Sequence, residues 1–229
     1  LSPVHTVETQ MCEVLKLHRN MSKQQAREES IRILGLTGIP DPKGCMVSYP
    51  FELSGGMQQR VMIAMALLCE PKILIADEPT TALDVTIQEQ ILYLIREWNK
   101  RLNMSVLFIT HDMGVVANLC HSVKVMYLGQ IVEEAKTEEM FANPLHPYTR
   151  GLLNCIPHLR VSREKLLPTI EGTVPSLSDI PAGCHFCTRC KQADERCKTM
   201  SPPEVEAESG HRGKCWKYAD WQNQKGKMN

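Results

Sequence analysis

The most constraining feature of the sequence is the short apolar run Ile73–Ala76, which is followed at once by the acidic pair Asp77 and Glu78. A continuous apolar run of this length is typical of a strand that is buried on both faces of a parallel sheet. A second such run covers Ser105–Ile109, and apolar residues at helical spacing lie between the two runs, over Thr86–Arg101. Because strand and helix alternate, the sequence predicts an α/β fold in which a parallel sheet is flanked by helices.

Apolar periodicity and capping residues predict further elements on both sides of this stretch. Helices are expected over 6–18, 22–36, 53–68 and 112–120, and further strands over 123–127 and 130–133. After Asn143 proline becomes frequent, and five of the ten cysteines lie between Cys184 and Cys215. We therefore expect a domain over 1–143, with a helical subdomain near 6–70 and a core near 71–143, and an extension over 144–229 that does not continue the sheet.

The composition excludes several classes of protein. Lys and Arg total 26 and Asp and Glu total 26, so the formal net charge is zero, which argues against a nucleic-acid coat or a polybasic membrane anchor. Hydrophobic residues make up 43% of the chain, which excludes wholesale disorder. No apolar run reaches the ~18–20 residues of a membrane-spanning helix. With ten cysteines and no secretion signal, we expect an intracellular chain whose thiols are reduced or bind metal.

The acidic pair predicts magnesium and water chemistry. Adjacent carboxylates at the end of a buried strand are costly unless a cation neutralises them. Magnesium bound to a nucleotide is such a cation, because it prefers one or two carboxylates together with phosphate oxygens and waters. We therefore assign Asp77 to magnesium, through a water, and Glu78 to the attacking water as general base. The alternative is an ordinary solvated acidic pair that begins a loop.

Two other groups point to phosphate. Ser54, Gly55 and Gly56 open a helix whose unpaired N–H groups and partial positive charge suit a γ-phosphate, with the Ser54 hydroxyl as a further donor. The plainer alternative is a serine N-cap with a flexible turn. His111 follows the strand that ends at Ile109 and could hydrogen-bond a terminal phosphate, although histidine is also an ordinary residue at a helix start. The three groups in this order favour nucleotide chemistry.

The motifs around these residues resemble those of the ABC ATPases. The stretch Leu53–Arg60 is similar to the signature motif of that family, Ile73–Pro79 to its Walker B strand with the catalytic glutamate, Ala82–Asp84 to its D-loop, and His111 to its switch histidine. More narrowly, three stretches resemble the ATP-binding subunits of oligopeptide and dipeptide importers, a group that includes nickel importers. These stretches are RVMIAMALLCEPKILIADEPTTALDVTIQ, LFITHDMGVVA and HPYTRGLL.

The resemblance implies a composite site in a pair of ATPase subunits that use ATP and Mg²⁺. Asp77 would serve the magnesium, Glu78 would polarise the water, His111 would sense the γ-phosphate and Asp84 would couple the two sites. The signature residues would bind the γ-phosphate held by the opposite subunit; they are Leu53, Ser54, Gly55, Gly56 and Gln58.

The resemblance also implies partners and a location. The chain would be a cytoplasmic subunit, peripheral on the inner face of the cell membrane, that energises the import of peptides or nickel. It would pair with a homologous sister ATPase, as a heterodimer, and drive a membrane permease that an extracellular substrate-binding protein feeds. No nucleic acid is expected as a partner.

One motif of the family is missing from the 229 residues. No Gly-x-x-x-x-Gly-Lys-Ser/Thr sequence occurs, although this loop supplies the amides and the lysine that hold the β- and γ-phosphates. The Q-loop glutamine and the adenine-stacking aromatic of the family are absent too, and Leu1–Val7 resembles the segment just after the Q-loop. We therefore expect a subunit truncated at its N-terminus, without its Walker A half, that hydrolyses ATP negligibly when alone.

The cysteines of the extension predict a metal site. Cys184, Cys187 and Cys190 form two successive Cys-x-x-Cys steps, and Cys197 and Cys215 follow. Four thiolates fit zinc or an iron–sulfur cluster, and free thiols are the third alternative. The importer family carries a similar pattern at positions matching Cys184, Cys190, Cys197 and Cys215, which is associated in some members with a 4Fe–4S cluster. Cys187 is an addition to that pattern.

Two other classes of protein remain open at this point. A DNA-maintenance ABC ATPase would need a long coiled coil before the signature, whereas Thr6–Tyr49 is short and has no heptad run. A metal-binding structural module with vestigial ATPase motifs is the second alternative. The intact Asp77, Glu78 and His111 argue against such decay.

Overall fold

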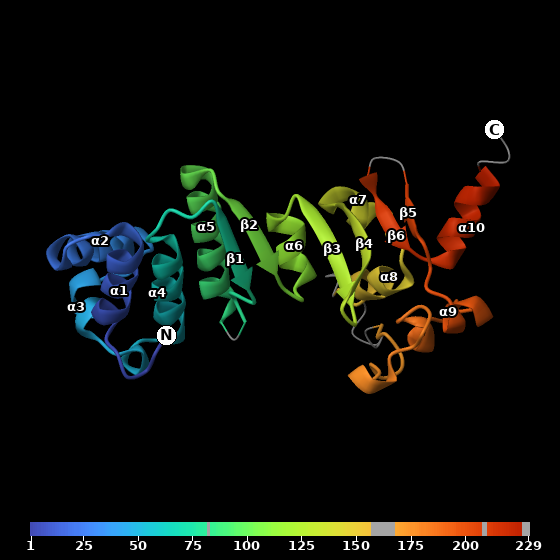
Figure 1. The fold of residues 1–229 in the computed structure, drawn as a ribbon, viewed down its shortest axis with the longest axis horizontal. Helices are drawn as coiled ribbons and strands as arrows, with labels where there is room; N and C mark the ends of the chain where they lie inside the picture. Colours follow the sequence, from blue (N-terminus) through green and yellow to red (C-terminus); the bar gives the residue numbers. More distant parts are fainter. Residues whose placement is uncertain (82, 157–167, 208–209, 226–229) are drawn as a thin grey trace. The chain divides into compact units, whose positions relative to one another are not determined.

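The structure, a computed structural model, describes residues 1–81, 83–156, 168–207 and 210–225 (Figure 1). Contacts within the chain group these residues into two compact units, Leu1–His111 and Asp112–Asn229. In the described part of the chain, no helix is both long and apolar enough to cross a membrane.

The first unit begins with a helical layer. Its elements are α1 (Val7–Arg19), α2 (Lys23–Leu36), α3 (Pro42–Val47), the short 3₁₀ helix η1 (Pro50–Glu52) and α4 (Gly55–Leu67). Side chains that accept hydrogen bonds from the free N–H groups of the first turn cap these helices. At the start of α2, the Ser22 hydroxyl accepts a hydrogen bond from the Gln25 amide, and the Gln25 side chain accepts one from the Ser22 amide. The predicted helices over 6–18, 22–36 and 53–68 are thus confirmed.

A parallel strand pair completes the first unit. β1 (Ile73–Asp77) and β2 (Ser105–Ile109) pair in parallel along their whole length, and α5 (Val85–Leu102) connects them. Leu74 packs into the core of the unit, in the same cluster as Ile91 of α5. The predicted parallel pairing is confirmed, and these elements form one α/β layer.

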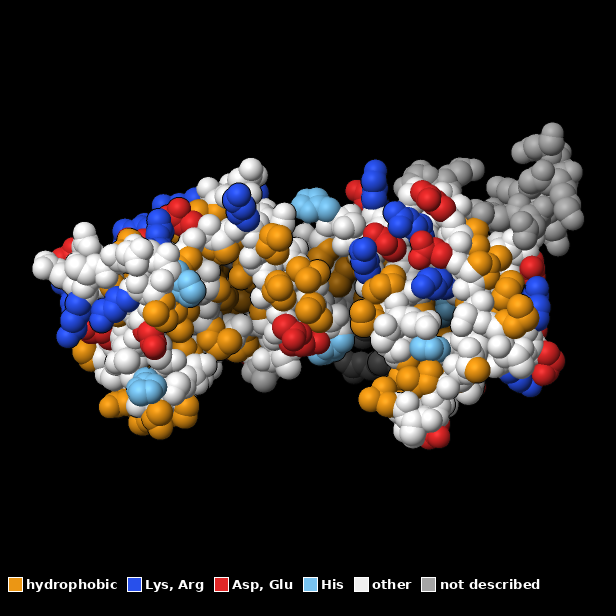
Figure 2. All heavy atoms as spheres, viewed as in Figure 1, with side chains coloured by type: hydrophobic (Ala, Val, Ile, Leu, Met, Phe, Trp, Pro, Cys, Tyr) orange, Lys and Arg blue, Asp and Glu red, His pale blue; other side chains and the backbone are white. Residues whose placement is uncertain are grey.

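The other face of this strand pair is open. Ile73 and Ile75 are each 64% exposed, Leu107 is 53% exposed and Ile109 is 44% exposed. Figure 2 shows hydrophobic side chains gathered in the part of the view where Figure 1 draws β1 and β2. The expectation of strands buried on both faces is therefore wrong for this chain, in which the core covers one face of the pair.

The second unit is built on an antiparallel sheet with the strand order β3-β4-β6-β5. β3 (Ser122–Tyr127) and β4 (Gln130–Lys136) form a hairpin in which Leu128 and Gly129 have φ angles of 43° and 76°. Two central residues with positive φ are typical of a type I′ turn, and a connection this short joins only antiparallel strands. The two strands predicted over 123–127 and 130–133 are therefore present, but they pair antiparallel and lie outside the parallel pair of β1 and β2.

The C-terminal extension joins this same sheet. β6 (Arg212–Lys214) pairs with β4, and β5 (Glu204–Glu206) pairs with β6. The extension therefore shares an antiparallel sheet with β3 and β4, and the compact units divide after His111, whereas the sequence predicts a boundary after Asn143. The helical elements of this unit are α6 (Met113–Leu119), α7 (Thr137–Ala142), α8 (Pro147–Asn154), η2 (Leu177–Asp179), η3 (Cys187–Arg189), α9 (Glu195–Thr199) and α10 (Trp216–Lys225).

A buried carboxylate links the extension to the rest of the second unit. Glu133 of β4 is fully buried, and its Oε1 lies 2.8 Å from Nε2 of His211, which is also buried. The same carboxylate accepts hydrogen bonds from the amides of Leu145 and His146, at 2.7 and 2.8 Å. One side chain of β4 therefore joins the segment before α8 to the segment before β6.

Candidate functional site

Glu78 stands at the end of the parallel strand pair in an unusual backbone conformation. Its φ angle is 47°, in the left-handed region that non-glycine residues rarely adopt. Its amide donates to the carbonyl of Ile109 at 2.9 Å, so the hydrogen-bond ladder between β1 and β2 reaches one residue beyond β1. Left-handed residues of this kind occur often at functional sites, where the surrounding structure holds them in place.

Both oxygens of the Glu78 carboxylate have partners. The hydroxyl of Thr81 donates to Oε2 at 2.6 Å, and Nδ1 of His111 lies 2.8 Å from Oε1. The hydrogen bond from Thr81, followed by that with His111, holds the pKa of Glu78 below its usual range. The two side chains stay accessible, because Glu78 is 37% and His111 79% exposed. This arrangement keeps an ionised, oriented carboxylate within reach of a ligand.

Thr81 is a site residue that the sequence analysis did not identify. It lies three residues after Glu78, in the turn that follows β1, and the Thr81 amide donates to the Glu78 carbonyl at 3.2 Å. The sequence does contain one signal for this contact, which is the short spacing between Thr81 and Glu78. A threonine hydroxyl in a turn often forms a hydrogen bond with an acceptor a few residues away.

Asp77 is the last residue of β1 and lies opposite Ile109 in the register of the pair. It is exposed, on the face that also carries Ile73 and Ile75, since residues two apart in a strand share a face. An accessible carboxylate next to Glu78 has the chemistry to hold a divalent cation through water.

The signature residues surround the start of α4. The Ser54 hydroxyl accepts from the Met57 amide at 3.3 Å, so Ser54 is the N-cap of this helix, and Gln58 donates to the Leu53 carbonyl at 3.1 Å. Ser54 and Gly55 are exposed, whereas Leu53 is buried. The Ser54 hydroxyl therefore acts as the N-cap of the plainer interpretation, and the helix start at Ser54 and Gly55 lies at the surface.

The two glycines have different neighbours. A Cβ atom on Gly56 would lie 2.9 Å from Cγ2 of Ile87 in α5, which is too close for an ordinary contact. A Cβ atom on Gly55 would meet only Cδ2 of Leu83, at an ordinary 3.9 Å. Gly56 therefore allows α4 to approach α5 closely, and Gly55 leaves space at the surface.

The D-loop residue Asp84 starts α5, where its Oδ1 accepts from the amide of Ile87 at 2.9 Å. Ala82 of the same motif lies outside the described residues. Because Leu83 and Ile87 are the residues nearest to Gly55 and Gly56, the D-loop and the signature turn are neighbours. The structure thus forms two groups, the pair Glu78 and His111, and the signature turn beside Leu83 and Ile87.

Two family models match the chain, "ABC transporter" over residues 1–81 and "Oligopeptide/dipeptide transporter, C-terminal region" over residues 132–197. A probable peptide ABC transporter ATP-binding protein of Sinorhizobium fredii is 51% identical over 95% of this chain and 65% of its own length. The oligopeptide transport ATP-binding protein AppD of Bacillus subtilis is 47% identical over 96% of this chain and 67% of its own length. The oligopeptide transport ATP-binding protein OppD of Escherichia coli is 49% identical over 95% of this chain and 64% of its own length.

The chain belongs to the ATP-binding proteins of peptide ABC transporters. It spans about two thirds of the length of these curated relatives (65%, 67% and 64%). A solved structure, the dimeric post-hydrolysis state of the ATP-binding cassette MJ0796 bound to ADP and Pi, is 30% identical and superposes with a TM-score of 0.53 over 60% of this chain and 59% of that one. The predicted family and the predicted ABC ATPase fold are therefore confirmed.

The cysteines of this ABC protein's extension gather around one cavity. Cys184, Cys187, Cys190, Cys197 and Cys215 all line it, together with residues that include His146, Phe186 and Trp216. All five are free thiols. Burial is the main cause that raises the pKa of Cys184 to about 11. Among the residues that the structure describes, however, no three His, Cys, Asp or Glu side chains form a group that could hold a metal ion. The metal site therefore stays a prediction.

Proposed function

We propose that this chain is part of an ATP-hydrolysing subunit of a peptide importer, in which Glu78 is the general base. The observation that carries this proposal is the Glu78 carboxylate at the end of the parallel strand pair, held by Thr81 and His111. The carboxylate is ionised and keeps its orientation through these two contacts, so it could accept a proton from an attacking water. The family of the chain supports ATP as the substrate.

The other site residues would act around this base. His111 is accessible and hydrogen-bonded to Glu78, so it would connect the carboxylate to a terminal phosphate. Asp77 would hold Mg²⁺ through a water, and the bound ion would neutralise phosphate charge. The exposed first turn of α4, with Gly55 and the capping Ser54, would bind the γ-phosphate held by a sister subunit. Asp84 caps α5 between Leu83 and Ile87, which lie beside that turn, and would couple the two sites.

Partners and location follow from the same proposal. The exposed signature turn would complete a composite site on the ATP held by another subunit, and we propose a homologous sister ATPase in a heterodimer as that subunit. The subunit would act in the cytoplasm on the inner face of the membrane, on a permease supplied by an extracellular binding protein. The relatives above are named for peptide or oligopeptide transport, which favours peptides over nickel and over DNA maintenance.

The test is ATP turnover by the purified chain, alone and fused behind the N-terminal segment of a full-length relative that carries an intact Walker A loop. We expect negligible turnover by the chain alone, and turnover by the fusion that Glu78→Gln reduces. We expect the rate of ATP turnover to fall by about 10²–10⁴-fold, which is the usual contribution of a general base. Magnesium-dependent turnover by the chain alone, abolished by Glu78→Gln, would overturn the expectation that turnover requires a Walker A loop.

We propose a second function for the extension, a structural metal site built from the cysteine cavity. The supporting observation is that five thiols line one cavity, and a set of soft donors suits a 4Fe–4S cluster or zinc. Four of them, with Cys184, Cys190, Cys197 and Cys215 as the family pattern suggests, would be drawn together by the metal and would clamp the extension. Iron, sulfide and zinc contents of anaerobically purified protein test this, and metal-free protein with five reactive thiols would contradict it.

A further inference from the structure

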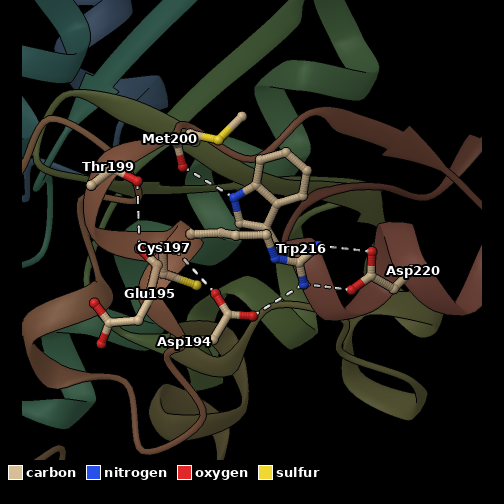
Figure 3. A network of polar contacts seen from close by, with 8 residues as sticks. Asp194, Glu195, Cys197, Thr199, Met200, Trp216 and Asp220 are labelled. Carbon is tan, nitrogen blue, oxygen red and sulfur yellow. Dashed lines mark hydrogen bonds and ion pairs between the residues drawn. The ribbon is translucent and has the colours of Figure 1, made fainter.

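A cluster of charged and aromatic side chains joins α9 to α10 next to the cysteine cavity. Nη2 and Nη1 of Arg196 lie 2.6 and 3.2 Å from the two carboxylate oxygens of Asp220, and Nη2 also lies 3.1 Å from Oδ2 of Asp194. The guanidinium carbon lies 5.1 Å from the centre of the Trp216 ring. Figure 3 shows Asp194, Asp220 and Trp216 grouped in this way. We call these four residues the Arg196 cluster.

The Arg196 cluster has a second connection through its indole. Nε1 of Trp216 donates to the carbonyl of Met200 at 3.0 Å, just beyond the end of α9 (Figure 3). The start of α10 is therefore attached to α9 by a bidentate ion pair, a stacked cation and a hydrogen bond. A guanidinium that pairs with two carboxylates and stacks on an indole has a defined orientation, which a flexible ammonium does not reproduce.

Two of the cavity cysteines are direct neighbours of this cluster in the chain. Cys197 follows Arg196, and its amide donates to Oδ1 of Asp194 at 3.2 Å. Cys215 precedes Trp216. The cluster thus connects the segment that carries Cys197 with the segment that carries Cys215.

Backbone contacts hold the other side of the cavity. The Cys184 amide donates to the Cys197 carbonyl at 2.8 Å, and the Cys187 amide donates to the Cys184 carbonyl at 3.0 Å. A Cβ atom on Gly183 would collide with the Cys197 carbonyl, so a glycine is needed for this approach. Backbone packing therefore places Cys184 against Cys197, whereas side chains of the Arg196 cluster tie Cys215 to them.

We propose that Arg196 is a positioning residue that holds Cys215 at the cysteine cavity before any metal binds. Its consequence for metal affinity rests on the metal site proposed above, while its effect on the thiols of the metal-free chain does not. A surface ion pair without such a role would contribute little to stability and would leave the thiols unaffected.

Three variants and one control separate these possibilities. Arg196→Ala removes the ion pairs and the stacked cation, Arg196→Lys keeps the charge but loses the planar fork, and Asp220→Asn weakens the ion pair from the α10 side. Lys198→Ala is the matched control, because Lys198 also flanks Cys197 but pairs with Glu195 inside α9. Thermal melts identify any variant that does not fold, and the remaining variants then carry the test.

The first measurement is the rate at which iodoacetamide alkylates each cysteine of the metal-free, reduced chain, read peptide by peptide by mass spectrometry. Cys155, which does not line the cavity, is the internal reference. We expect all three Arg196-cluster variants to raise the alkylation rate of Cys215 several-fold relative to Cys155, and Lys198→Ala to leave it unchanged. Equal rates in the folded variants and the unaltered chain would overturn the proposal.

The second measurement is a Co²⁺ titration of the same proteins. Loss of an outer positioning residue typically lowers metal affinity by about 10–100-fold, and we expect a loss of this size for Arg196→Ala and Arg196→Lys. If the unaltered chain binds neither cobalt nor iron, the proposed metal site fails, while a faster alkylation of Cys215 would still support the role of Arg196. If the chain binds cobalt and the variants match it in both measurements, Arg196 has no positioning role.

Discussion

The carboxylate of Glu78 shows how single side chains prepare this site. Its backbone is held in the left-handed region by the bond to Ile109, and its two oxygens are divided between Thr81 and His111. The acidic pair and the histidine were evident in the sequence, but their contact was not, because Glu78 and His111 are separated by β2 and α5. The sequence also did not indicate Thr81, since a hydroxyl three residues away is an ordinary feature of a turn.

Thr81→Val tests the electrostatics of this carboxylate. Loss of the hydroxyl donor removes the largest cause of the depressed pKa, so we expect the pKa of Glu78 to rise toward its usual value. The ionised form would then be lost at a higher pH, and the acid limb of the pH–rate profile of the fusion that carries a Walker A loop should move upward. Thr86→Val, in the first turn of α5, is the control. An unchanged acid limb in Thr81→Val would show that Thr81 does not tune Glu78.

At the scale of elements, close packing decides what each glycine of the signature does. Gly56 lies against Ile87 of α5, whereas Gly55 faces open space beside Leu83. The sequence treats the two glycines alike, because adjacent glycines before a helix predict a close backbone approach without saying to what. The structure assigns the close approach at Gly56 to a neighbouring helix.

Gly55→Ala and Gly56→Ala should therefore differ in stability. Both substitutions add the same methyl group at the start of α4, but overpacking against Ile87 costs about 1–3 kcal/mol at Gly56 alone. We expect Gly56→Ala to lower the urea midpoint of unfolding relative to Gly55→Ala. Equal midpoints would mean that Ile87 moves aside without cost.

The buried pair of Glu133 and His211 is a second feature of this scale. Glu133→Ala removes the acceptor for His211 and for the amides of Leu145 and His146 together. Leaving buried donors without an acceptor costs about 1–3 kcal/mol, so the free energy of unfolding should fall by that order. The adjacent Glu134→Ala, whose partner is the half-exposed Lys124, should cost only about 0–1 kcal/mol. A similar loss in both variants would show that the buried pair is not a link of the extension.

For the whole molecule, the open face of β1 and β2 is the feature with the largest consequence. Ile73, Ile75, Leu107 and Ile109 have the apolar character of strands covered on both sides, which is why the sequence predicted burial on both faces. An apolar sheet face of this kind promotes association when it is uncovered.

Ile75→Lys should therefore reduce self-association of the purified chain. A charge in the middle of the open face opposes its burial against a second copy. We expect a lower weight-average mass by light scattering at high concentration. Tyr93→Lys, which also replaces an exposed apolar residue but lies on α5, should leave the association unchanged. If both variants associate like the unaltered chain, another surface is responsible.

The sequence by itself determined the features that depend on neighbours along the chain. These are the helix starts at Ser22 and Ser54, the apolar strands, the acidic residues that end β1 and the family motifs, because capping, periodicity and local spacing depend on residues that are close in the chain.

Only the tertiary structure decided the features that depend on residues far apart. The hairpin of β3 and β4, the return of β6 to β4, the contact of Glu78 with His111 and the gathering of the cysteines around one cavity all require the chain to fold back on itself. Long-range pairing is set by the packing and hydrogen bonds of the folded chain, which no local pattern specifies.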